Sequence, residues 1–519
     1  MNSKTNKTLV NQELPDGWSW VSLGETGEYI NGFAFKPNHR ESEGLPIIRI
    51  QNLTDELKPL NLTNFDVPPE YKVSSGDLLV SWSATLDVFI WHRGPALVNQ
   101  HIFKVVPETR VIHNRLLFYW LKIAIEQLQN TEHLHGSTMK HINRGPFMAH
   151  KLPLPPANEQ TRIVEKLEEL LSDLDAGVAE LKAAQKKLLQ YRQSLMKSAV
   201  EGALTAEWRK THQPEETGAQ LLERILKQRR AHWEAKQLAK FEQQGKTPPK
   251  GWQDKYPEPV KPDNSDLPEL PELPEGWVWA SAEQICDFIT KGTTPTKGMD
   301  GDSEKTIPFL RVTNLTANGT LDMSDKVFVS ENTHSGFLAR SKVYPGDVLM
   351  NIVGPPLGQV SVVPSLFNEW NINQAIAIFR ALEGVLPEFI CVCLLSPFAQ
   401  HWLQLRSKTT AGQTNLTLEV CRSLPIPLPP KSEQHELAKL TEAGVDSIYE
   451  QINAIHISLK QSAAQRKNIL KAAFSGQLVP QDPNDEPASV LLERIRNERQ
   501  HAKTPARRSR RRTGEGISR

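Results

Sequence analysis

The chain has 519 residues, which predicts about three or four domains of ordinary size, and its 61 Lys and Arg nearly balance its 60 Asp and Glu. With 39% hydrophobic and 23% charged residues, the composition excludes an intrinsically disordered chain. The sequence has no apolar run of the roughly 18 residues that span a membrane and no apolar N-terminal signal, and its four cysteines are too few for a disulfide framework. A cytoplasmic protein of several domains is therefore expected.

The first predicted domain covers residues 14–156, after an N-terminal extension of residues 1–13. Short β-rich runs such as PIIRIQNL and DLLVSW are separated by Gly-Asp turns, and the apolar helix RLLFYWLKIAIEQL follows them. A polar loop that contains glycine (135–144) and the sequence LPLPP complete the domain. This order of elements predicts a compact α+β domain.

A long helix is predicted in the segment 157–217, because leucine recurs at every seventh position over about five heptads. The leucines of this expected coiled-coil seam, which should meet a partner helix, are Leu167, Leu174, Leu181, Leu188 and Leu195. The intervening seam positions are Ile163, Leu170, Gly177, Ala184, Tyr191 and Ser198. At a rise of 1.5 Å per residue, a helix of about 45 residues is roughly 65 Å long.

A charged helix (218–247), a Pro-rich stiff linker (248–272) and a second mixed domain (273–430) follow. The segment 431–479 predicts another long helix with a looser seam that includes Ile448 and Ile455. The C-terminal segment (480–519) ends in an Arg-rich tail that should be disordered, with ten Lys and Arg against two Asp and Glu over residues 494–519. Phosphate binding and simple solubilisation are both open as roles for this tail.

The second half of the chain repeats the first with an offset of about 270 residues. LPDGW at 14–18 returns as LPEGW at 273–277, SGDLLV at 75–80 as PGDVLM at 345–350, and LLERI occurs at 221–225 and 491–495. The aligned pairs also include Arg49 with Arg311, Asn52 with Asn314, Asn99-Gln100 with Asn373-Gln374, and Glu159-Gln160 with Glu433-Gln434. This period is too long for a solenoid, so each copy is a domain followed by a long helix.

The sequence contains no recognisable catalytic constellation. It lacks the GxxxxGK[ST] phosphate loop and the GxGxxG nucleotide turn. The fragment 354–357 (GPPL) lacks the Asp or Asn and the aromatic residue of an adenine methyltransferase pocket, and His133 and His135 lack companion metal ligands. No catalytic residue and no metal ligand is therefore predicted, and the repeated residues are interpreted as scaffold.

Two mixed domains, each ending in PLPP and a Glu-Gln pair and each followed by a long helix, resemble the specificity subunit of type I restriction–modification systems. LTAEWR at 204–209 and LLERI at 491–495 resemble the enterobacterial branch of that family, and the resemblance covers nearly the whole chain. It implies an α+β fold in which two similar target-recognition domains are joined by two long antiparallel coiled-coil helices, with an internal pseudo-two-fold duplication.

The resemblance also implies a bacterial, non-catalytic subunit in which each domain reads one half of a split, asymmetric DNA site. The helices would set the spacing and dock two modification subunits, which carry S-adenosylmethionine and methylate adenine N6. Two restriction subunits would add ATP- and Mg-dependent translocation and cleavage. No cofactor is expected on this chain itself, and no membrane is expected as a partner.

Contacts with double-stranded DNA are expected from the polar loop after the apolar helix in each copy, because Lys, Arg, Asn and Gln serve phosphates and base edges. The alternative is a structural loop, and repetition favours a structural role for the aligned arginines. The candidate residues are Lys140, His141, Asn143, Arg144, Lys408, Gln413, Asn415, Arg49 and Arg311.

Two other classes of protein compete with this interpretation. A standalone nuclease or methyltransferase with two recognition domains would need a cofactor or metal site. A coiled-coil adaptor that binds only proteins would not retain DNA in a pulldown. The bases recognised and the length of the unread gap do not follow from the sequence, because direct readout depends on which side chains reach the base edges.

Overall fold

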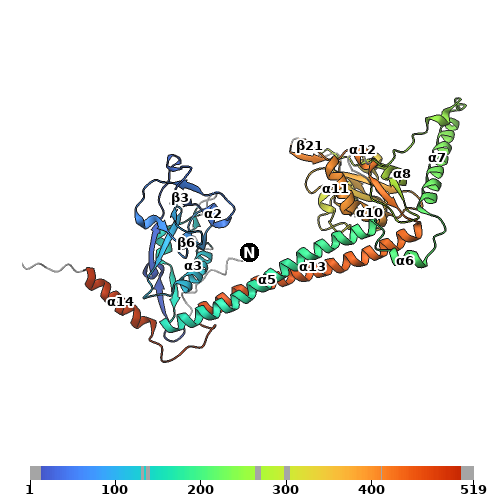
Figure 1. Ribbon diagram of the computed structural model, residues 1–519. Helices are drawn as coiled ribbons and strands as arrows, with labels where there is room; N and C mark the ends of the chain where they lie inside the picture. The colour runs from blue at the N-terminus through green and yellow to red at the C-terminus, as the bar shows by residue number, and fades with distance from the viewer. Residues whose placement is uncertain are drawn as a thin grey trace, which may run out of the picture. The chain divides into compact units, whose positions relative to one another are not determined.

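The computed structural model describes residues 13–129, 134–135, 141–263, 270–296, 304–410 and 412–503. The chain forms two compact units, one of Met1–Glu180 with Ser458–Arg519 (unit 1) and one of Leu181–Ile457 (unit 2). Both units mix helices and sheets, and two helices of 44 residues each are the longest elements, which confirms the predicted fold class (Figure 1). In the described part of the chain, no helix is both long and apolar enough to cross a membrane.

Among the described residues, unit 1 contains two four-stranded sheets and two strand pairs, one of which is the hairpin of β10 (Leu134–His135) and β11 (His141–Ile142). The antiparallel sheet has the order β2-β9-β6-β7, the second sheet has the order β4-β3-β8-β5 with β3 and β8 parallel, and β1 pairs with β12. Its strands are β1 (Ser19–Ser22), β2 (Gly27–Asn31), β3 (Leu45–Ile48), β4 (Asn61–Thr63), β5 (Lys72–Val73), β6 (Leu78–Ser81), β7 (Asp87–Ile90), β8 (Ala96–Val98), β9 (Ile102–Pro107) and β12 (Lys151–Leu154).

The predicted apolar helix of unit 1 is α3 (Asn114–Gln129), which packs against β7. Its apolar residues recur at helical spacing, so Leu117, Leu121 and Leu128 are buried on one face. Trp120, which is also buried, donates from Nε1 to the carbonyl of Pro153 at 2.7 Å. The other helices of the unit are α1 (Leu23–Thr26), η2 (Pro37–His39), α2 (Ile50–Thr54), η3 (Pro69–Tyr71), α4 (Arg144–Ala149) and α14 (Ala488–Lys503).

Unit 2 repeats this plan with a four-stranded sheet of order β14-β20-β17-β18, a three-stranded sheet of order β16-β15-β19 and the pair β13-β23. The strands are β13 (Val278–Ser281), β14 (Cys286–Lys291), β15 (Lys305–Leu310), β16 (Phe328–Ser330), β17 (Val348–Asn351), β18 (Val360–Val362), β19 (Asn371–Ile372), β20 (Ile376–Ala381) and β23 (Pro425–Leu428). The helices are α6 (Ala206–Thr211), α7 (Gly218–Gln243), η4 (Trp252–Lys255), α8 (Ala282–Ile285), η5 (Val312–Asn314), α9 (Glu331–Ser335), η6 (Ala339–Ser341), α10 (Pro387–Leu395), α11 (Pro397–Arg406) and α12 (Leu418–Ser423).

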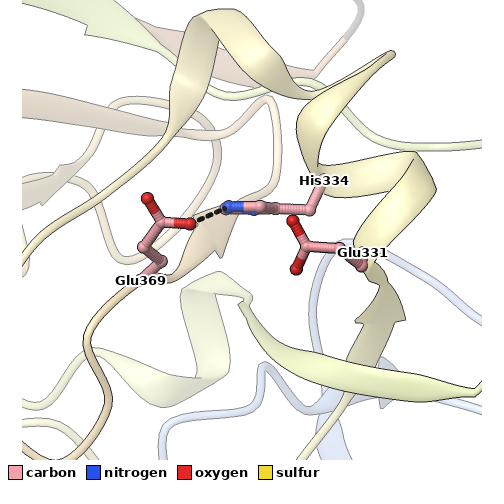
Figure 2. Close-up of side chains that lie close together, drawn as sticks. All are labelled: Glu331, His334 and Glu369. Carbon is pink, nitrogen blue, oxygen red and sulfur yellow. Dashed lines mark hydrogen bonds and ion pairs between the residues drawn. The ribbon is translucent and has the colours of Figure 1, made fainter.

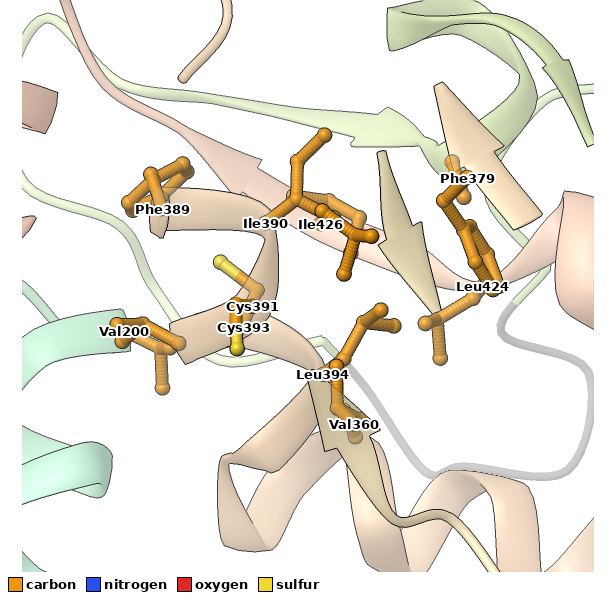
Figure 3. Packing of buried hydrophobic residues seen from close by; sticks show 14 of the residues in the cluster. Val200, Val360, Phe379, Phe389, Ile390, Cys391, Cys393, Leu394, Leu424 and Ile426 are labelled. Carbon is orange, nitrogen blue, oxygen red and sulfur yellow. The ribbon is translucent and has the colours of Figure 1, made fainter. Parts of the chain in front are cut away.

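The apolar run FICVCLL forms α10 in the core of unit 2. Figure 3 shows Cys391 and Cys393 among apolar side chains of this core, and they are 6% and 1% exposed. Burial raises the pKa of the Cys391 thiol to about 12, so this residue stays protonated and packs as a small apolar side chain.

The long helices are α5 (Ala157–Val200) and α13 (Lys431–Phe474), and they run antiparallel in each unit. In unit 1, Asp175 near the middle of α5 pairs with Arg466 late in α13. In unit 2, Gln185 of α5 lies 2.8 Å from Nε2 of His456, and the side chain of Leu195 packs beside Gly444 early in α13.

Burial along α5 is greatest at the two ends of the helix. Leu167 and Leu195 are buried, whereas Leu174, Leu181 and Leu188 are half-buried. The predicted intervening positions Ala184 and Tyr191 are wrong, because both residues are exposed, Tyr191 by 59%. The covered face instead lies four residues after each leucine, at Leu171, Val178, Gln185, Arg192 and Ala199. An apolar sequence pattern does not reveal this line, because Gln185 and Arg192 are polar. Their side chains form hydrogen bonds to His456 and to the carbonyl of Ala317.

On α13, Ile448 and Ile455 are 1% and 8% exposed. They belong to a buried line along the helix that also includes Leu437, Val445 and Ile452.

The start of α5 carries a buried carboxylate that joins three separate segments of unit 1. Glu159 is 1% exposed and accepts hydrogen bonds from Nε1 of Trp18 at 3.0 Å and from Nε2 of Gln481 at 3.3 Å. Burial raises the pKa of Glu159, although these hydrogen bonds act against the rise. Trp18 stands at the beginning of the domain and Gln481 follows the end of α13, so one side chain ties both to the start of α5.

Glu433 occupies the same place at the start of α13 in unit 2. It accepts hydrogen bonds from Nε1 of Trp277 at 2.9 Å and from Oγ1 of Thr205 at 2.6 Å, and it forms an ion pair with Arg209. Thr205 and Arg209 follow the end of α5, as Gln481 follows the end of α13. The repeated Trp and Glu residues are therefore structural in both copies.

Repeated glutamine and glycine residues make further contacts at the starts of the long helices and just after their ends. Oε1 of Gln160 accepts from the backbone N–H of His113 at 2.7 Å, and Oε1 of Gln434 accepts from that of Leu386 at 2.9 Å. Gly202 and Gly476 follow the ends of α5 and α13 with φ of +70°, a conformation that favours glycine. A Cβ at Gly202 would lie 2.4 Å from Cγ of Pro274, and one at Gly476 would lie 2.4 Å from Cγ of Pro15. Each domain thus begins against the end of the long helix of the other copy.

The Pro-rich segment before the second domain is more ordered than a simple linker. Trp252 and Tyr256 pack on Trp233 of α7 with ring centroids 5.8 and 5.5 Å apart. Nε1 of Trp402 donates to the carbonyl of Asp263 at 3.0 Å. The aromatic residues between the prolines supply the apolar contact that the proline count alone did not predict. Residues 264–269, like the Arg-rich tail from residue 504, lie outside the described residues.

Glu433 is paired with the charged side chain of Arg209, whereas Glu159 accepts hydrogen bonds from the uncharged side chains of Trp18 and Gln481. Replacement of the two glutamates by glutamine should therefore have different effects on stability. We expect Glu433→Gln to lower the free energy of unfolding by about 3–5 kcal/mol, because Arg209 loses its buried partner. Glu159→Gln should have little effect at neutral pH, since an amide keeps an acceptor for Trp18 and removes a buried charge. Urea midpoints followed by tryptophan fluorescence measure both effects.

The raised pKa of Glu159 predicts how the stability of the protein changes with pH. The folded state binds this proton more tightly than the unfolded state, so the contribution of Glu159 to stability is fully present below the unfolded pKa of about 4.3 and is lost as pH rises through the folded pKa. The midpoint of the wild type relative to Glu159→Gln should therefore fall as pH rises from about 4. A constant difference between the two midpoints would contradict this assignment.

The burial gradient along α5 predicts unequal losses for the same substitution. Leu167→Ala should lower the free energy of unfolding by about 2–5 kcal/mol, because the side chain is 0% exposed and its removal leaves a cavity. Leu174→Ala, at a half-buried position, should lower it by only about 1 kcal/mol. Equal losses in urea denaturation would show that the two helices pack more closely around Leu174 than its exposure indicates.

Candidate nucleic-acid interface

The predicted polar loop of the first domain contains a short β-hairpin. It is formed by β10 (Leu134–His135) and β11 (His141–Ile142), which pair antiparallel. His141 also makes an isolated bridge to Ser83, and the N–H of Ile142 donates to the carbonyl of Trp82 at 3.1 Å. The hairpin is thus fixed to the segment that follows β6. Lys140 and the side chain of His135 lie outside the described residues.

The second domain has an equivalent hairpin of β21 (Lys408–Thr410) and β22 (Gln413–Asn415). Asn415 bridges to Val353, and the N–H of Gly354 donates to the carbonyl of Thr414 at 2.8 Å. Val353 follows β17 as Ser83 follows β6, and these strands hold the same place in their sheets. The two predicted loops therefore stand at matching positions of the two domains.

The candidate contact residues of the hairpins differ in how freely they can reach a ligand. Lys408, Gln413 and Asn143 are exposed, whereas His141 and Asn415 are half-buried. Arg144 is exposed, yet its guanidinium donates to the carbonyl of Tyr29 at 3.3 Å and lies 6.0 Å from the ring centre of Phe103.

Arg422 makes the matching bond to the carbonyl of Ile289 at 3.2 Å in unit 2, from a different position on its helix. The Arg144 guanidinium thus has a structural partner in its own domain.

The aligned arginines Arg49 and Arg311 begin a repeated turn. In both, the backbone N–H donates to Oδ1 of an asparagine three residues later, at 3.1 Å for Asn52 and 2.8 Å for Asn314. Both asparagines are buried, and their amides donate to two backbone carbonyls each. Arg311 is further paired with Asp325, while Arg49 forms no ion pair with a described residue. The repetition of this motif is explained by the turn.

A polar constellation beside the first hairpin escaped the sequence-based prediction. Nε1 of Trp82 donates to Oδ1 of Asn31 at 3.0 Å, its ring lies 5.4 Å from that of His101, and Nε2 of His101 lies 3.2 Å from Nε2 of Gln100. Nδ1 of His101 is buried and has no hydrogen-bond partner among the described residues.

The aligned positions of unit 2 hold different residues. Trp82, Asn31 and His101 are replaced there by Ile352, Lys291 and Ala375, at places flanked by repeated glycine and Asn-Gln residues. Divergence next to repeated scaffold is the signal that could have found these positions in the sequence.

A carboxylate and histidine cluster in unit 2 has the residue types of a metal site, but its atoms are already engaged. Figure 2 shows Glu331, His334 and Glu369 together. The amide of Asn371 donates to Nδ1 of His334, and Nε2 of His334 therefore carries its proton toward Glu369 at 2.8 Å. Lys342 also binds Glu369, and both donors hold the pKa of that carboxyl below its usual range. We interpret the cluster as a structural hydrogen-bond network.

Comparison with known proteins assigns the chain to a family. Residues 15–185 and 274–456 match the type I restriction modification DNA specificity domain, so the chain belongs to this family and contains two copies of its domain.

Individual relatives match over nearly the full length of the chain. The specificity subunit of the type I restriction enzyme EcoBI from Escherichia coli is 28% identical, covering 96% of this chain and 97% of that protein. The EcoKI specificity subunit from Escherichia coli K12 is 24% identical, covering 94% and 96%. A solved chain of a type I R-M system has the same fold, with a TM-score of 0.61 over 90% of this chain and 100% of that chain at 18% identity. The predicted resemblance to the enterobacterial branch is confirmed.

The exposed residues of the second hairpin allow a direct test of DNA contact. Lys408→Ala with Gln413→Ala should weaken binding of the assembled protein to its target duplex about 10- to 100-fold, as the loss of one or two contacts of about 1–3 kcal/mol predicts. Fluorescence anisotropy with the target duplex measures the affinity. Lys326→Ala removes an equally exposed charge of unit 2 outside the hairpin and serves as the control. An unchanged affinity of the hairpin variant would assign the hairpin a structural role.

Proposed function

We propose that this chain is the DNA sequence-recognition subunit of a type I restriction–modification complex and that each domain reads one half of a split, asymmetric site. The observation that carries the proposal is the pair of hairpins at matching positions of two domains whose neighbouring side chains differ. Membership in the specificity family and the full-length similarity to specificity subunits support it.

The physical argument follows from duplication with divergence. Two domains of one fold can dock on two half-sites of a duplex, as the two halves of a symmetric dimer do. Because residues beside the first hairpin, such as Trp82 and His101, have no counterpart in unit 2, the two half-sites would differ in sequence. The paired long helices would hold the domains at a fixed distance and so define the length of the unread gap, which a flexible tether would not do.

The remaining chemistry would belong to partner subunits in the bacterial cytoplasm. Two modification subunits would bring S-adenosylmethionine and methylate adenine N6, and two restriction subunits would bring ATP- and Mg-dependent translocation and cleavage. This chain would act by placing the modification subunits over the adenines to be methylated. The full-length likeness to named specificity subunits supports this division of labour.

Mapping of methylated adenines in a genome that carries the chain with its partner subunits tests the proposal. We expect a target of two short specific parts separated by unread bases. Exchange of residues 19–150 for the equivalent part of a relative should change one part of the target only, because each domain begins and ends at its own repeated Trp and PLPP residues.

The matched control exchanges the corresponding part of the second domain and should change the other part only. A single uninterrupted target, or a change of both parts after one exchange, would be incompatible with two independent reading domains.

A further inference from the structure

Helix α7 is buried in the core of unit 2 only along its first turns. The N–H of Gly218 donates to the carbonyl of Gly276 at 2.6 Å, and Leu221 and Ile225 are buried in the core of the unit. Arg229 then donates to the backbone carbonyls of Glu283 and Cys286. Beyond Ile225, no residue of α7 is buried.

The helix at the same place of the repeat in unit 1 is α14. The N–H of Ala488 donates to the carbonyl of Gly17 at 2.8 Å, and Leu491 and Ile495 are buried. The two copies therefore dock one helix each beside the beginning of a domain, and each helix leads into a segment outside the repeat.

The segment 226–256, which we call the α7 arm, is held together by its own aromatic residues. Trp252 stacks on Trp233 at 5.8 Å and lies 6.0 Å from Phe241, while Tyr256 lies 5.5 Å from Trp233. The guanidinium of Arg230 lies 5.6 Å from the ring centre of Tyr256. Figure 1 shows α7 as a separate helix of unit 2. The arm is thus an ordered element with a largely exposed surface.

The arm is strongly basic, unlike the domain to which it is attached. Residues 226–256 contain eight Lys and Arg against three Asp and Glu, whereas residues 273–430 contain 11 against 14. Six of its lysines are exposed and form no ion pair with a described residue; they are Lys227, Lys236, Lys240, Lys246, Lys250 and Lys255. In the other copy, the residues after α14 include the run of arginines at 507–512.

The composition of the arm surface favours a polyanion over a protein partner. Its aromatic rings are used in the internal stack, and Leu238, at 46% exposure, is the one large apolar side chain of the arm that is prominently exposed. Protein interfaces are built around apolar and aromatic cores from which lysine is depleted. Exposed lysines on a polar helix are instead suited to the phosphates of DNA, where they act by releasing counterions.

We propose that the α7 arm binds the DNA phosphate backbone next to the bases read by the second domain, independently of sequence. The arm supplies an attraction that the weakly acidic domain does not provide. It strengthens binding to any duplex by the same factor and leaves the recognised bases to the domain itself. The proposal rests on the DNA-recognition function proposed above.

The test uses the full-length chain assembled with its modification subunits and the triple variant Lys236→Ala, Lys240→Ala and Lys246→Ala. Affinity is measured by fluorescence anisotropy over a range of salt, with a duplex that contains the target and one of unrelated sequence. If all three lysines contact phosphates, the slope of log K against log salt falls by up to about 3. The ratio of wild-type to variant affinity then decreases about 40-fold between 50 and 200 mM salt.

Two matched variants separate charge from shape. Replacement of the same three lysines by arginine should preserve the salt slope, and Gln237→Ala with Gln243→Ala and Gln244→Ala should leave affinity unchanged. Alanine is a good helix former, so circular dichroism should show an intact helix content in the alanine variants. The set of methylated sequences should be the same for wild type and lysine variants.

Three results would overturn the proposal: an unchanged salt slope in the triple alanine variant, a loss confined to the target duplex, or a loss of assembly with the modification subunits while the slope persists. The second result would make the arm a base reader and the third would make it a protein-docking element. Preference of the wild type for the target over the unrelated duplex, measured in the same assay, reports separately on the DNA-recognition function.

Discussion

The architecture depends on a buried carboxylate at the start of each long helix. Glu159 and Glu433 are each 1% exposed, and burial of a carboxylate is unfavourable unless hydrogen-bond donors surround it. The donors come from two distant places in the sequence, the first tryptophan of the domain and the residues after the end of the other long helix. Each of these glutamates is therefore fully hydrogen-bonded only when the domain, the start of one long helix and the end of the other are folded together. Glu159 has this role in unit 1 and Glu433 has it in unit 2.

This constraint explains why the repeat preserves some residues and not others. The paired Glu, Gln, Asn and Gly residues, with Trp18 and Trp277, make their contacts within their own unit. Some of the residues that differ between the copies, such as Trp82 and Ile352, lie beside the hairpins. The two domains thus share one scaffold but differ in the residues around their hairpins. This arrangement is expected if two similar domains read two different half-sites.

Charge is distributed unevenly over this scaffold. The second domain is weakly acidic, and basic residues gather instead on the α7 arm and in the C-terminal segment. In α14, the basic residues Arg494, Arg496 and Arg499 are paired with Glu486, Glu25 and Glu108 of unit 1. Arg496 and Arg499 therefore help to attach the helix to its domain, whereas the lysines of the α7 arm form no such pairs with described residues. The separation of base reading from electrostatic attraction would allow the domains to diverge without a change in overall DNA affinity.

The sequence by itself determined the duplication, the mixed domains, the two long helices and the family, because periodicity and repetition are properties of the residue order. It also placed the leucine line of α5, but not its companion line, since polar Gln185 and Arg192 occupy the covered face through hydrogen bonds that no apolar pattern reveals. Only the tertiary structure showed that Glu159 and Trp18, 141 residues apart, share a hydrogen bond. It likewise placed both predicted loops as hairpins beside equivalent strands and revealed Trp82, Asn31 and His101 near one of them. Contacts between residues far apart in the chain depend on how strands and helices pack in three dimensions, and that packing leaves no local periodicity in the sequence.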